Sequence, residues 1–592
     1  MLSNYNSDDY TSMVQSIRDF AARVTLHLRR IKPTVNKVLS LRDIYVKRSR
    51  SISPLKKRYY KLFISRSLLS FLFILSPGCG GKHWQKTTEK RFIQLSVLSD
   101  YIEKFNAGDD ELVTTYISNS QAFDFLSTNI PRFECPDKQM EEIYFFRWWT
   151  YRKHIRNTPE GFIITEFLPD VPWAGKYNAI SCPGMHQYNE GRWLHNQQYL
   201  NDYTYYWFRK GGSVRSYSFP VAYALYSQYL VSGNDLIVRD FLPDLIANFN
   251  AWEKERYDAS CGLFWQIDDR DGMEVSICSS GYRATINSYM AAEAKAIATI
   301  AQMSGRSEAR MFTEKSTQIQ ANMLKMLWDQ EAEFFKVLSR KENSTLCDAR
   351  ELHGYTPWCF DLIEDAEYAR AWKYLMDTSH FFAPYGPTTA EQCHPGFKIS
   401  YEGHECQWNG PSWPFATSVT LTGLANLLNS QQQRFISKDD YFKLLQIYTQ
   451  CHRLTKDDGT VVPWIDENIN PFTGDWISRT RLKTWQNGTW SASKGGVERG
   501  KDYNHSTYCD LVISGLIGIR PQEGGMLVVN PLLPEGVWDY FCLENVMYQG
   551  KRITVLYDKT GTKYHQGKGL MIFVDGKRKT SSRNLSMLKC RL

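Results

Sequence analysis

Apolar residues recur at every third or fourth position through most of the chain between about residues 90 and 520. Seven segments carry this spacing clearly: 139–155, 200–211, 218–233, 240–255, 286–305, 307–328 and 412–429. Gly, Asn or Asp residues lie near their ends, where helices commonly stop. The pattern predicts about ten to twelve helices, and no close repeat of the solenoid type accompanies them.

Long loops rich in Trp, Gly, Pro, Asp and Asn separate these helical segments. They cover residues 159–196, 257–285, 350–360, 381–413 and 456–506. Long structured loops on a regular scaffold are where binding and catalytic residues concentrate. We therefore expect the function of the protein to lie in these loops.

The pattern changes after about residue 522, where short apolar runs alternate with polar residues and glycine-containing turns. The Asp575-Gly576 pair is typical of a two-residue hairpin turn. We predict antiparallel strands for this part of the chain. A piece of about 70 residues is marginal as an independent unit, so we expect it to pack on the helical body.

Composition restricts the function classes. Aromatic residues make up 14% of the 592 residues, which suits flat apolar binding faces as well as a large core. The net charge is +8, but residues 1–66 alone carry +11, which leaves −3 for the rest. A mildly acidic body does not favour nucleic-acid binding, so no nucleic-acid partner is predicted.

The N-terminal region has the three-part layout of a secretory signal peptide. A basic stretch at 56–61 precedes an apolar run at 68–75, and small residues then lead to Cys79. The apolar run is too short to span a bilayer. The layout predicts a lipoprotein signal peptide at 56–79, a lipid anchor on Cys79 as the one membrane attachment, and export to a bacterial periplasm or cell surface.

The alternative for this region is a basic amphipathic stretch with a short buried helix. The signal begins unusually late, which suggests that Met1 is not the true translation start. Residues 1–55 would then be an upstream translation.

The 13 cysteines are scattered, without a C-x-x-C pair or any spacing typical of zinc or redox sites. We predict no metal site. If Cys79 is lipidated, 12 cysteines remain, and their pairing cannot be deduced from the sequence. Most are expected to be small buried hydrophobes.

One group of carboxylates lies in the glycine-bounded segment 262–277, directly before a strong helix. It contains Asp268, Asp269, Asp271 and Glu274. Carboxylates this close repel one another, and burial raises the pKa of such a group. A carboxyl that stays protonated at neutral pH can act as a general acid. The alternatives are a solvated acidic loop or a calcium site, although the EF-hand spacing is not met.

A second constellation lies at 405–419, where Trp408 and Trp413 flank Asn409 at the start of a helix. Indole faces suit sugar rings, and an amide suits their hydroxyl groups. The alternative is a helix start with two core tryptophans.

The third stretch, 463–476, places Glu467 just before an Asn-Pro-Phe-Thr-Gly turn at 470–474. A carboxylate at the edge of a turn is usually solvated. Glu467 follows the apolar residues Pro463, Trp464 and Ile465, so the alternative is a buried carboxylate with a functional role.

Together these stretches resemble the inverting glycosidases of the six-hairpin clan, near glycoside hydrolase family 63 and the mannosylglycerate hydrolase-like enzymes. The segments "ENINPFTG" and "WNGPSW" carry the resemblance, which spans roughly residues 140–520. It implies that Glu467 is the catalytic base and Asp271 the general acid. The family's usual wording around the acid is absent, so Asp268 or Asp269 stays open as the acid.

The resemblance implies a mainly α fold, an (α/α)6 toroid barrel with a small C-terminal β-domain. The expected organisation is a basic segment at 1–79, a helical lead-in at 80–139, the barrel at 140–521 and the β-domain at 522–592.

The implied activity is exo-acting hydrolysis of an α-glucoside or α-mannoside with inversion at the anomeric carbon, which needs no cofactor. The partner is an oligosaccharide or glycoside. The expected substrate-binding residues are Arg270, Glu274, Trp358, Trp408, Asn409, Trp413 and His505.

Two alternatives remain open at this stage. One is a six-hairpin enzyme of other specificity, such as a rhamnosidase or a phosphorylase, and a phosphorylase would not need Glu467. The other is a surface lipoprotein that binds glycans without cleaving them. The presence of both carboxylates favours an enzyme.

Overall fold

The computed structural model describes residues 91–592, apart from 341–344, 405, 485–495 and 497. The chain divides into two compact units, Met1–Thr88 and Glu89–Leu592, and all described residues belong to the second. The predicted signal peptide and Cys79 therefore lie outside the described residues. Within the described residues, no helix combines the length and the apolar character needed to cross a membrane.

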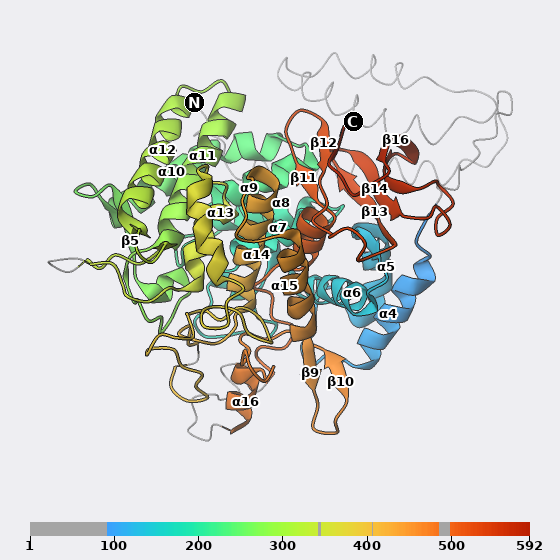
Figure 1. Ribbon diagram of the computed structural model, residues 1–592, viewed down its shortest axis with the longest axis horizontal. Helices are drawn as coiled ribbons and strands as arrows, with labels where there is room; N and C mark the ends of the chain where they lie inside the picture. The colour runs from blue at the N-terminus through green and yellow to red at the C-terminus, as the bar shows by residue number, and fades with distance from the viewer. Residues whose placement is uncertain (1–90, 341–344, 405, 485–495, 497) are drawn as a thin grey trace, which may run out of the picture. The chain divides into compact units, whose positions relative to one another are not determined.

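Between residues 138 and 516 of the described chain, twelve helical segments alternate between an outer and an inner position (Figure 1). The outer segments are α6 (Lys138–Lys153), α8 (Gln198–Arg209), α10 (Leu236–Arg256), α12 (Glu308–Leu327), the 3-10 segment η6 (Ala366–Tyr374) and α15 (Lys438–Cys451). The inner segments are α7 (Gly184–Gly191), α9 (Val221–Ser232), α11 (Ala284–Met303), α13 (Thr356–Cys359), α14 (Pro414–Ser430) and the π-helical segment η8 (Leu511–Leu516).

The inner segments form a closed ring. Each contacts the next along the chain, from α7 through α9, α11, α13 and α14 to η8. Glu190 of α7 closes the ring, because its carboxylate accepts the backbone N–H groups of Tyr508 at 3.1 Å, Cys509 at 2.9 Å and Asp510 at 2.7 Å. In the outer layer α15 contacts α6. The mainly α fold with an (α/α)6 barrel, predicted from the sequence, is confirmed.

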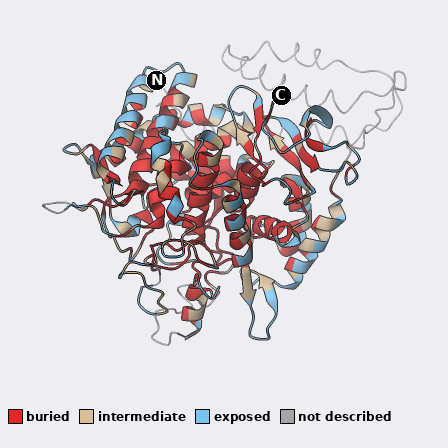
Figure 2. Cartoon of the chain, in the orientation of Figure 1, coloured by how far each residue is buried: buried red, intermediate tan, exposed pale blue. Residues whose placement is uncertain are grey.

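The sequences of neighbouring helices explain which of them becomes an inner one. Helix α11 has small or apolar residues on every face and is buried along almost its whole length. Helix α12 buries a single stripe, made by Phe312, Ser316, Ile319, Met323 and Leu327, as an amphipathic helix does. Figure 2 shows the same contrast, with buried residues concentrated on the central helices and exposed ones on the peripheral helices.

The connections within the barrel are unequal in length. Every inner helix from α7 to α14 is preceded by a longer connection than the one that follows it to the next outer helix, and η8 too is preceded by a long connection. The long connections are 154–183, 210–220, 257–283, 328–355, 375–413 and 452–510. Because they all lead from outer to inner helices, they share one end of the barrel, and the predicted catalytic residues lie on them.

Small hairpins stiffen four of these connections. They are formed by β2 (Ile155–Thr158) with β3 (Gly161–Ile164), β4 (Tyr257–Asp258) with β5 (Leu263–Gln266) and β6 (Gly281–Tyr282), β7 (Trp328–Asp329) with β8 (Phe334–Phe335), and β9 (Arg453–Thr455) with β10 (Val461–Pro463). Isolated bridges join different connections, including Glu351 to Ala390 and Ser412 to Ile469. The loop end is therefore a connected layer.

The C-terminal region forms antiparallel sheets, as predicted. The larger sheet has the order β1 (Arg132–Glu134), β13 (Tyr540–Tyr548), β14 (Lys551–Asp558), β15 (Gly569–Val574) and β16 (Lys577–Ser582). The smaller joins β11 (Ile519–Pro521), β12 (Met526–Val529) and β17 (Leu588–Arg591). Asp575 and Gly576 form the predicted tight turn, with φ of 48° and 76°.

The lead-in contributes to both parts of the structure. Helices α4 (Leu95–Ala107) and α5 (Ala122–Asn129) contact α6, while β1 adds a strand to the C-terminal sheet. Arg132 of β1 forms a buried ion pair with Glu544 of β13 at 2.9 Å. One further helix, α16 (Ile477–Thr484), lies in the last long connection.

Candidate active site

Four carboxyl groups from three long connections gather around one thiol. Burial raises the pKa of Cys182 well above its ordinary value, and the charges of Glu166, Glu274, Asp271 and Glu467 raise it further. A charge affects a thiol in this way only when it lies nearby. Both predicted catalytic carboxylates therefore belong to one cluster, which we call the carboxyl cluster.

Asp271 ends a short 3-10 helix, Asp268–Asp271, and Gly272 follows it with a φ of 72°. A Cβ on Gly272 would lie 2.8 Å from the Cys182 sulfur, so both the backbone conformation and the close approach require glycine. This turn carries Asp271 into the interior, where its exposed fraction is 6%. Asp269 on the same turn is exposed.

Asp271 is firmly held. Its Oδ2 accepts hydrogen bonds from the Arg283 Nε at 2.9 Å and from the Thr285 hydroxyl, while its Oδ1 is buried and has no partner within hydrogen-bond distance. Both side chains of the Arg283 pair are fully buried. A fixed positive charge therefore lies against the carboxyl that was expected to donate a proton.

Arg283 in turn lies next to a histidine–glutamate pair. The His353 Nε2 lies 2.9 Å from the Glu351 Oε2 and 3.1 Å from the Arg283 Nη2. His353 and Arg283 hold the pKa of Glu351 below its ordinary value against the effect of burial, so Glu351 is ionised. The His353 Nε2–H then donates to Glu351, and the Arg283 guanidinium places a positive charge beside the pair.

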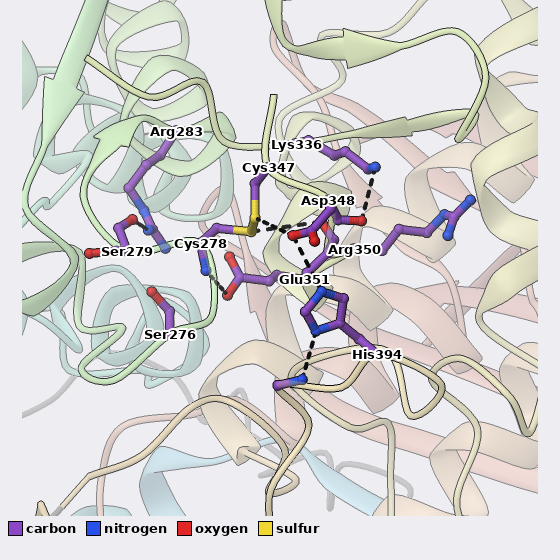
Figure 3. The surroundings of a disulfide bond; sticks show 12 residues. Ser276, Cys278, Ser279, Arg283, Lys336, Cys347, Asp348, Arg350, Glu351 and His394 are labelled. Carbon is purple, nitrogen blue, oxygen red and sulfur yellow. Dashed lines mark hydrogen bonds and ion pairs between the residues drawn. A yellow bond between two sulfur atoms is a disulfide. The ribbon is translucent and has the colours of Figure 1, made fainter. Parts of the chain in front are cut away.

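A disulfide lies next to Glu351 and Arg283 (Figure 3). Cys278 is bonded to Cys347, which lies 69 residues further along the chain. The Cys278 N–H donates to the Glu351 Oε1 at 3.1 Å. The bond therefore ties the connection that carries Asp271 to the connection that carries Glu351. The other ten described cysteines are free thiols, and five of them are buried, fewer than the majority that was expected.

Glu274 faces the cluster from the same connection as Asp271. Its Oε2 accepts the indole N–H of Trp408 at 3.0 Å. Burial raises the pKa of Glu274 to about 8, and the charges of Glu467 and Asp269 contribute to that rise. Glu274 therefore retains a proton at neutral pH.

The turn after Glu467 is an Asn-centred one. The Asn470 Oδ1 accepts the backbone N–H groups of Phe472 at 3.0 Å and Thr473 at 3.3 Å. Gly474 has a φ of 78° and packs against the Tyr385 ring. Ile469 forms backbone bridges to Ser412 and to Trp476, so the chain before the turn is fixed on both sides.

Glu467 itself is buried, with an exposed fraction of 4%. Its Oε1 accepts from the Cys406 thiol at 2.9 Å, and its Oε2 accepts from the Ser478 hydroxyl at 3.2 Å. The Arg499 Nη2 lies 3.5 Å from the same Oε2. This residue is therefore not a solvated turn carboxylate, and its hydrogen bonds fix where its oxygens point.

The predicted sugar platform is a stack of aromatic rings. Trp408 and Trp413 lie with centroids 4.1 Å apart and planes at 19°, and Phe415 stacks on Trp413 at 4.5 Å. Both indoles are buried, with exposed fractions of 1% and 4%. The edge of Trp408 contacts the cluster, because its indole N–H donates to Glu274. The faces of the rings stack on one another.

The remaining predicted binding residues lie in different surroundings, and no contact joins Trp358 to the carboxyl cluster among the described residues. The His505 ring packs on Tyr503 at 4.0 Å, and burial lowers its pKa far below the ordinary value, so it is neutral. The Asn409 Oδ1 is buried without a partner. Trp358 lies in the aromatic core with Phe335 at 5.6 Å.

Arg270 is exposed, and its guanidinium lies over the Tyr217 ring at 5.4 Å. Its backbone carbonyl accepts the Ser218 N–H at 2.8 Å. Arg270 therefore lies at the exposed edge of the carboxyl cluster, next to Asp271 in the sequence.

Several site residues were not predicted from the sequence. Burial raises the pKa of Glu166 to about 8 and that of Asp466 to about 7. Glu166 accepts the Tyr503 hydroxyl at 2.8 Å. The one signal for Glu166 in the sequence is that an acidic residue follows the apolar strand β3 after a single threonine. Cys182 and Arg499 gave no comparable signal, because each is significant only through distant neighbours.

One group of side chains has the donor atoms of a metal site. Among the described residues, atoms of His380, Glu391 and Cys393 lie within 4.8 Å of one another. The Glu391 Oε2 is already paired with the Arg350 Nη1 at 2.8 Å. A metal ion would have to compete with that guanidinium, so we assign no metal to this group.

A helical barrel with buried carboxyl groups on the long connections at one end defines a glycoside hydrolase of the six-hairpin type. Residues 176–506 match the mannosylglycerate hydrolase MGH1-like glycoside hydrolase domain, which is more than half of the chain. The protein therefore belongs to the MGH1-like glycoside hydrolases and is a glycosidase. Residues 519–581 match the C-terminal domain of glycosyl hydrolase family 65, which agrees with the C-terminal sheets.

A solved structure described as a sialidase is 37% identical, with a TM-score of 0.77, and the match covers 84% of this chain but 45% of that one. This chain thus spans less than half the length of that protein.

Two further solved structures are less similar. A GH63 mannosylglycerate hydrolase from Thermus thermophilus is 11% identical with a TM-score of 0.44, covering 63% of this chain and 99% of that one. A GH78 rhamnosidase from a Bacillus species is 12% identical with a TM-score of 0.48, covering 73% and 40%. At these scores neither bears on the activity of this chain.

Removing the disulfide with Cys278→Ser and Cys347→Ser is expected to lower the free energy of unfolding, because the bond restricts a long loop in the unfolded chain. For a separation of 69 residues the chain-entropy relation gives about 4 kcal/mol. Equilibrium denaturation in urea measures the change, and Cys393→Ser, at an exposed free thiol, is the control. Equal stability of the double variant and the control would contradict the expectation.

Proposed function

We propose that the protein is an exo-acting glycosidase that hydrolyses an α-glycosidic bond, of the α-glucoside or α-mannoside type, with inversion. The observation that supports this most directly is the carboxyl cluster, where buried acidic residues from separate connections face one another. Hydrolysis with inversion needs one carboxyl to protonate the leaving oxygen and a second to activate water on the opposite face of the sugar.

Glu467 is the proposed base. Cys406, Ser478 and Arg499 hold its two oxygens in place from the protein side. In the reaction it accepts a proton from the water whose oxygen forms the new bond to the anomeric carbon. The glycosidic bond breaks as that bond forms, through an oxocarbenium-like transition state.

Two residues, Asp271 and Glu274, compete for the role of proton donor. Asp271 is the residue that the family resemblance implies, but its Oδ2 already accepts from Arg283 and Thr285. Glu274 has the raised pKa of about 8 that a donor at neutral pH requires, and the nearby charge of Glu467 contributes to it. We therefore propose Glu274 as the general acid, with Asp271 as the residue that fixes the turn before it.

The base assignment is tested with Glu467→Gln on a panel of α-glycosides, with the released anomer followed by proton NMR. The wild type is expected to release the β-anomer, and the variant to lose about 10²- to 10⁴-fold in kcat, the range for a positioned base. Asp457→Asn, at an exposed carboxylate of the same connection, is the control. The panel includes sialosides, because a related solved structure is described as a sialidase, and rhamnosides.

Three outcomes would overturn this proposal. Release of the α-anomer would exclude inversion. Cleavage that requires inorganic phosphate would indicate a phosphorylase. Glycan binding without turnover across the panel would indicate a binding protein.

The acid assignment is tested by comparing Glu274→Gln and Asp271→Asn on two aryl glycosides whose phenols differ in acidity. A leaving group that needs no protonation is expected to be cleaved almost normally by the variant that lacks the acid, while the poorer one loses about 10²- to 10⁴-fold. We expect this split for Glu274→Gln. The same split for Asp271→Asn, or for the Asp268 or Asp269 variants, would move the acid to that residue.

The dependence of kcat/KM on pH tests the assignment of Glu274 as the general acid independently. Glu274 is protonated below its pKa of about 8 and ionised above it. Because the donor must be protonated, kcat/KM on the poorer leaving group falls as the pH rises through about 8. Glu274→Gln removes that fall.

We further propose that the protein is exported and anchored through a lipid on Cys79. The basic and apolar layout of residues 56–79 supports this, and a disulfide between Cys278 and Cys347 suits an oxidising compartment. Mass spectrometry of the mature protein from its native host is expected to give an N-terminal lipidated Cys79. An intact N-terminal region, or processing at another position, would contradict the proposal.

A further inference from the structure

A pocket lies near the carboxyl cluster, because Arg270, one of its lining residues, directly precedes Asp271. Its volume is about 260 Å3, and its lining residues are Arg215, Ser216, Trp252, Glu255, Arg256, Gln266 and Arg270. This is smaller than the roughly 300–1,000 Å3 of pockets that hold drug-sized ligands. The pocket therefore suits one part of a substrate rather than a whole one.

The pocket has an excess of positive charge. Three of its lining residues are arginines and one is acidic, and that residue, Glu255, pairs with Arg215 at 3.2 Å. Arg270 donates to the Ser216 carbonyl at 3.3 Å, which leaves its charge unneutralised. Arg256 has no acidic partner among the described ion pairs, and its Nε is buried without a hydrogen bond.

The surroundings of Arg256 add to this excess. Its guanidinium stacks on one face of Trp265 at 4.3 Å, and that of Arg340 stacks at 3.9 Å from the centroid of the same ring. Burial lowers the pKa of Arg256, the charge of Glu255 opposes that shift, and the charges of Arg340 and Arg270 lower the pKa further. Clustered guanidinium groups with few carboxylates are costly to hold together, and an anionic ligand offsets that cost.

Tyr217 and Arg270 form the boundary between this pocket and the carboxyl cluster. Arg270 lines the pocket and lies over the Tyr217 ring. On the other side, burial raises the pKa of Tyr217, and the charges of Glu274 and Glu166 raise it further. A sugar in the cluster and a group in the pocket would therefore be neighbours.

We propose that this pocket is a subsite for an anionic group, a carboxylate or a sulfate, carried by the glycan that is cleaved at the carboxyl cluster. The inference rests on the proposed glycosidase function and narrows its substrate class to acidic glycans. Guanidinium groups bind both oxyanions through paired hydrogen bonds, and arginine is favoured over lysine for that geometry. The binding experiment below distinguishes a carboxylate from a sulfate.

The first experiment measures binding, independently of turnover, by calorimetry on the full protein. The probes are glucuronate, glucose 6-sulfate and glucose. The two charged sugars are expected to bind more tightly than glucose, and Arg256→Gln to weaken them about 10- to 100-fold, as loss of a charged hydrogen bond does. Arg310→Gln, at an exposed arginine of α12 that pairs with Glu314 and lies outside the pocket lining, is the matched control.

A variant at an exposed position guards against a folding defect of Arg256→Gln. Arg215→Gln removes a pocket arginine whose side chain is partly solvated and is expected to weaken the charged probes in the same direction. Preference for glucuronate over glucose 6-sulfate, or the reverse, identifies the anionic group. Equal binding of charged and neutral probes, or an equal loss in Arg310→Gln, would overturn the subsite.

The second experiment compares kcat/KM on matched neutral and charged glycosides. The subsite predicts a preference for the charged substrate that disappears in Arg256→Gln. Tight binding of charged probes without any cleavage would leave the subsite in place and refute the glycosidase proposal. Cleavage of neutral glycosides with no charge preference in binding or turnover would refute the subsite alone.

Discussion

The burial of several negative charges in one place is the constraint on which the loop end of this barrel depends. Each carboxyl in the cluster is accommodated in a different way. Asp271 has the buried Arg283 guanidinium, Glu467 has three donors, and the pKa values of Glu166 and Glu274 are raised so that each retains a proton near neutral pH. In the proposed mechanism the raised pKa of Glu274 supplies the acid, and the three donors around Glu467 fix the base, so one environment gives the two carboxyls separate roles.

The scaffold could largely be predicted from the sequence because its signals are local. The apolar stripes of α12 and the all-round apolar α11 are visible in single stretches of chain, and so is the Asp575-Gly576 turn. The short inner segment α13 and the π-helical η8 have no such signal, since neither is long enough to show a period. The strand β1 was missed because Arg132 and its partner Glu544 in β13 lie 412 residues apart, a separation that no local pattern encodes.

The site likewise contains residues that local motifs predict and residues that only the folded structure brings together. Glu467 and the tryptophan pair stand in motifs that family resemblance can locate, whereas the partners that decide their chemistry come from elsewhere in the chain. Nothing near Asp271 in the sequence shows that Arg283 will neutralise it, and nothing near Glu274 shows that Trp408 will hold it. Residue types were therefore predictable, but protonation states were not, because these depend on burial and on neighbours brought together by folding.

The disulfide has a consequence for how such a site can diverge among related proteins. Cys278 and Cys347 join two connections covalently, so an insertion in one of them must be matched by a compatible length in the other. The 375–413 connection is held to its neighbours by noncovalent contacts instead, namely single backbone bridges and the Arg350–Glu391 ion pair, and such contacts tolerate modest changes of length. Evolution of new sugar preferences is thus expected to proceed mainly through the bridged connection, while the disulfide-linked pair changes slowly and jointly.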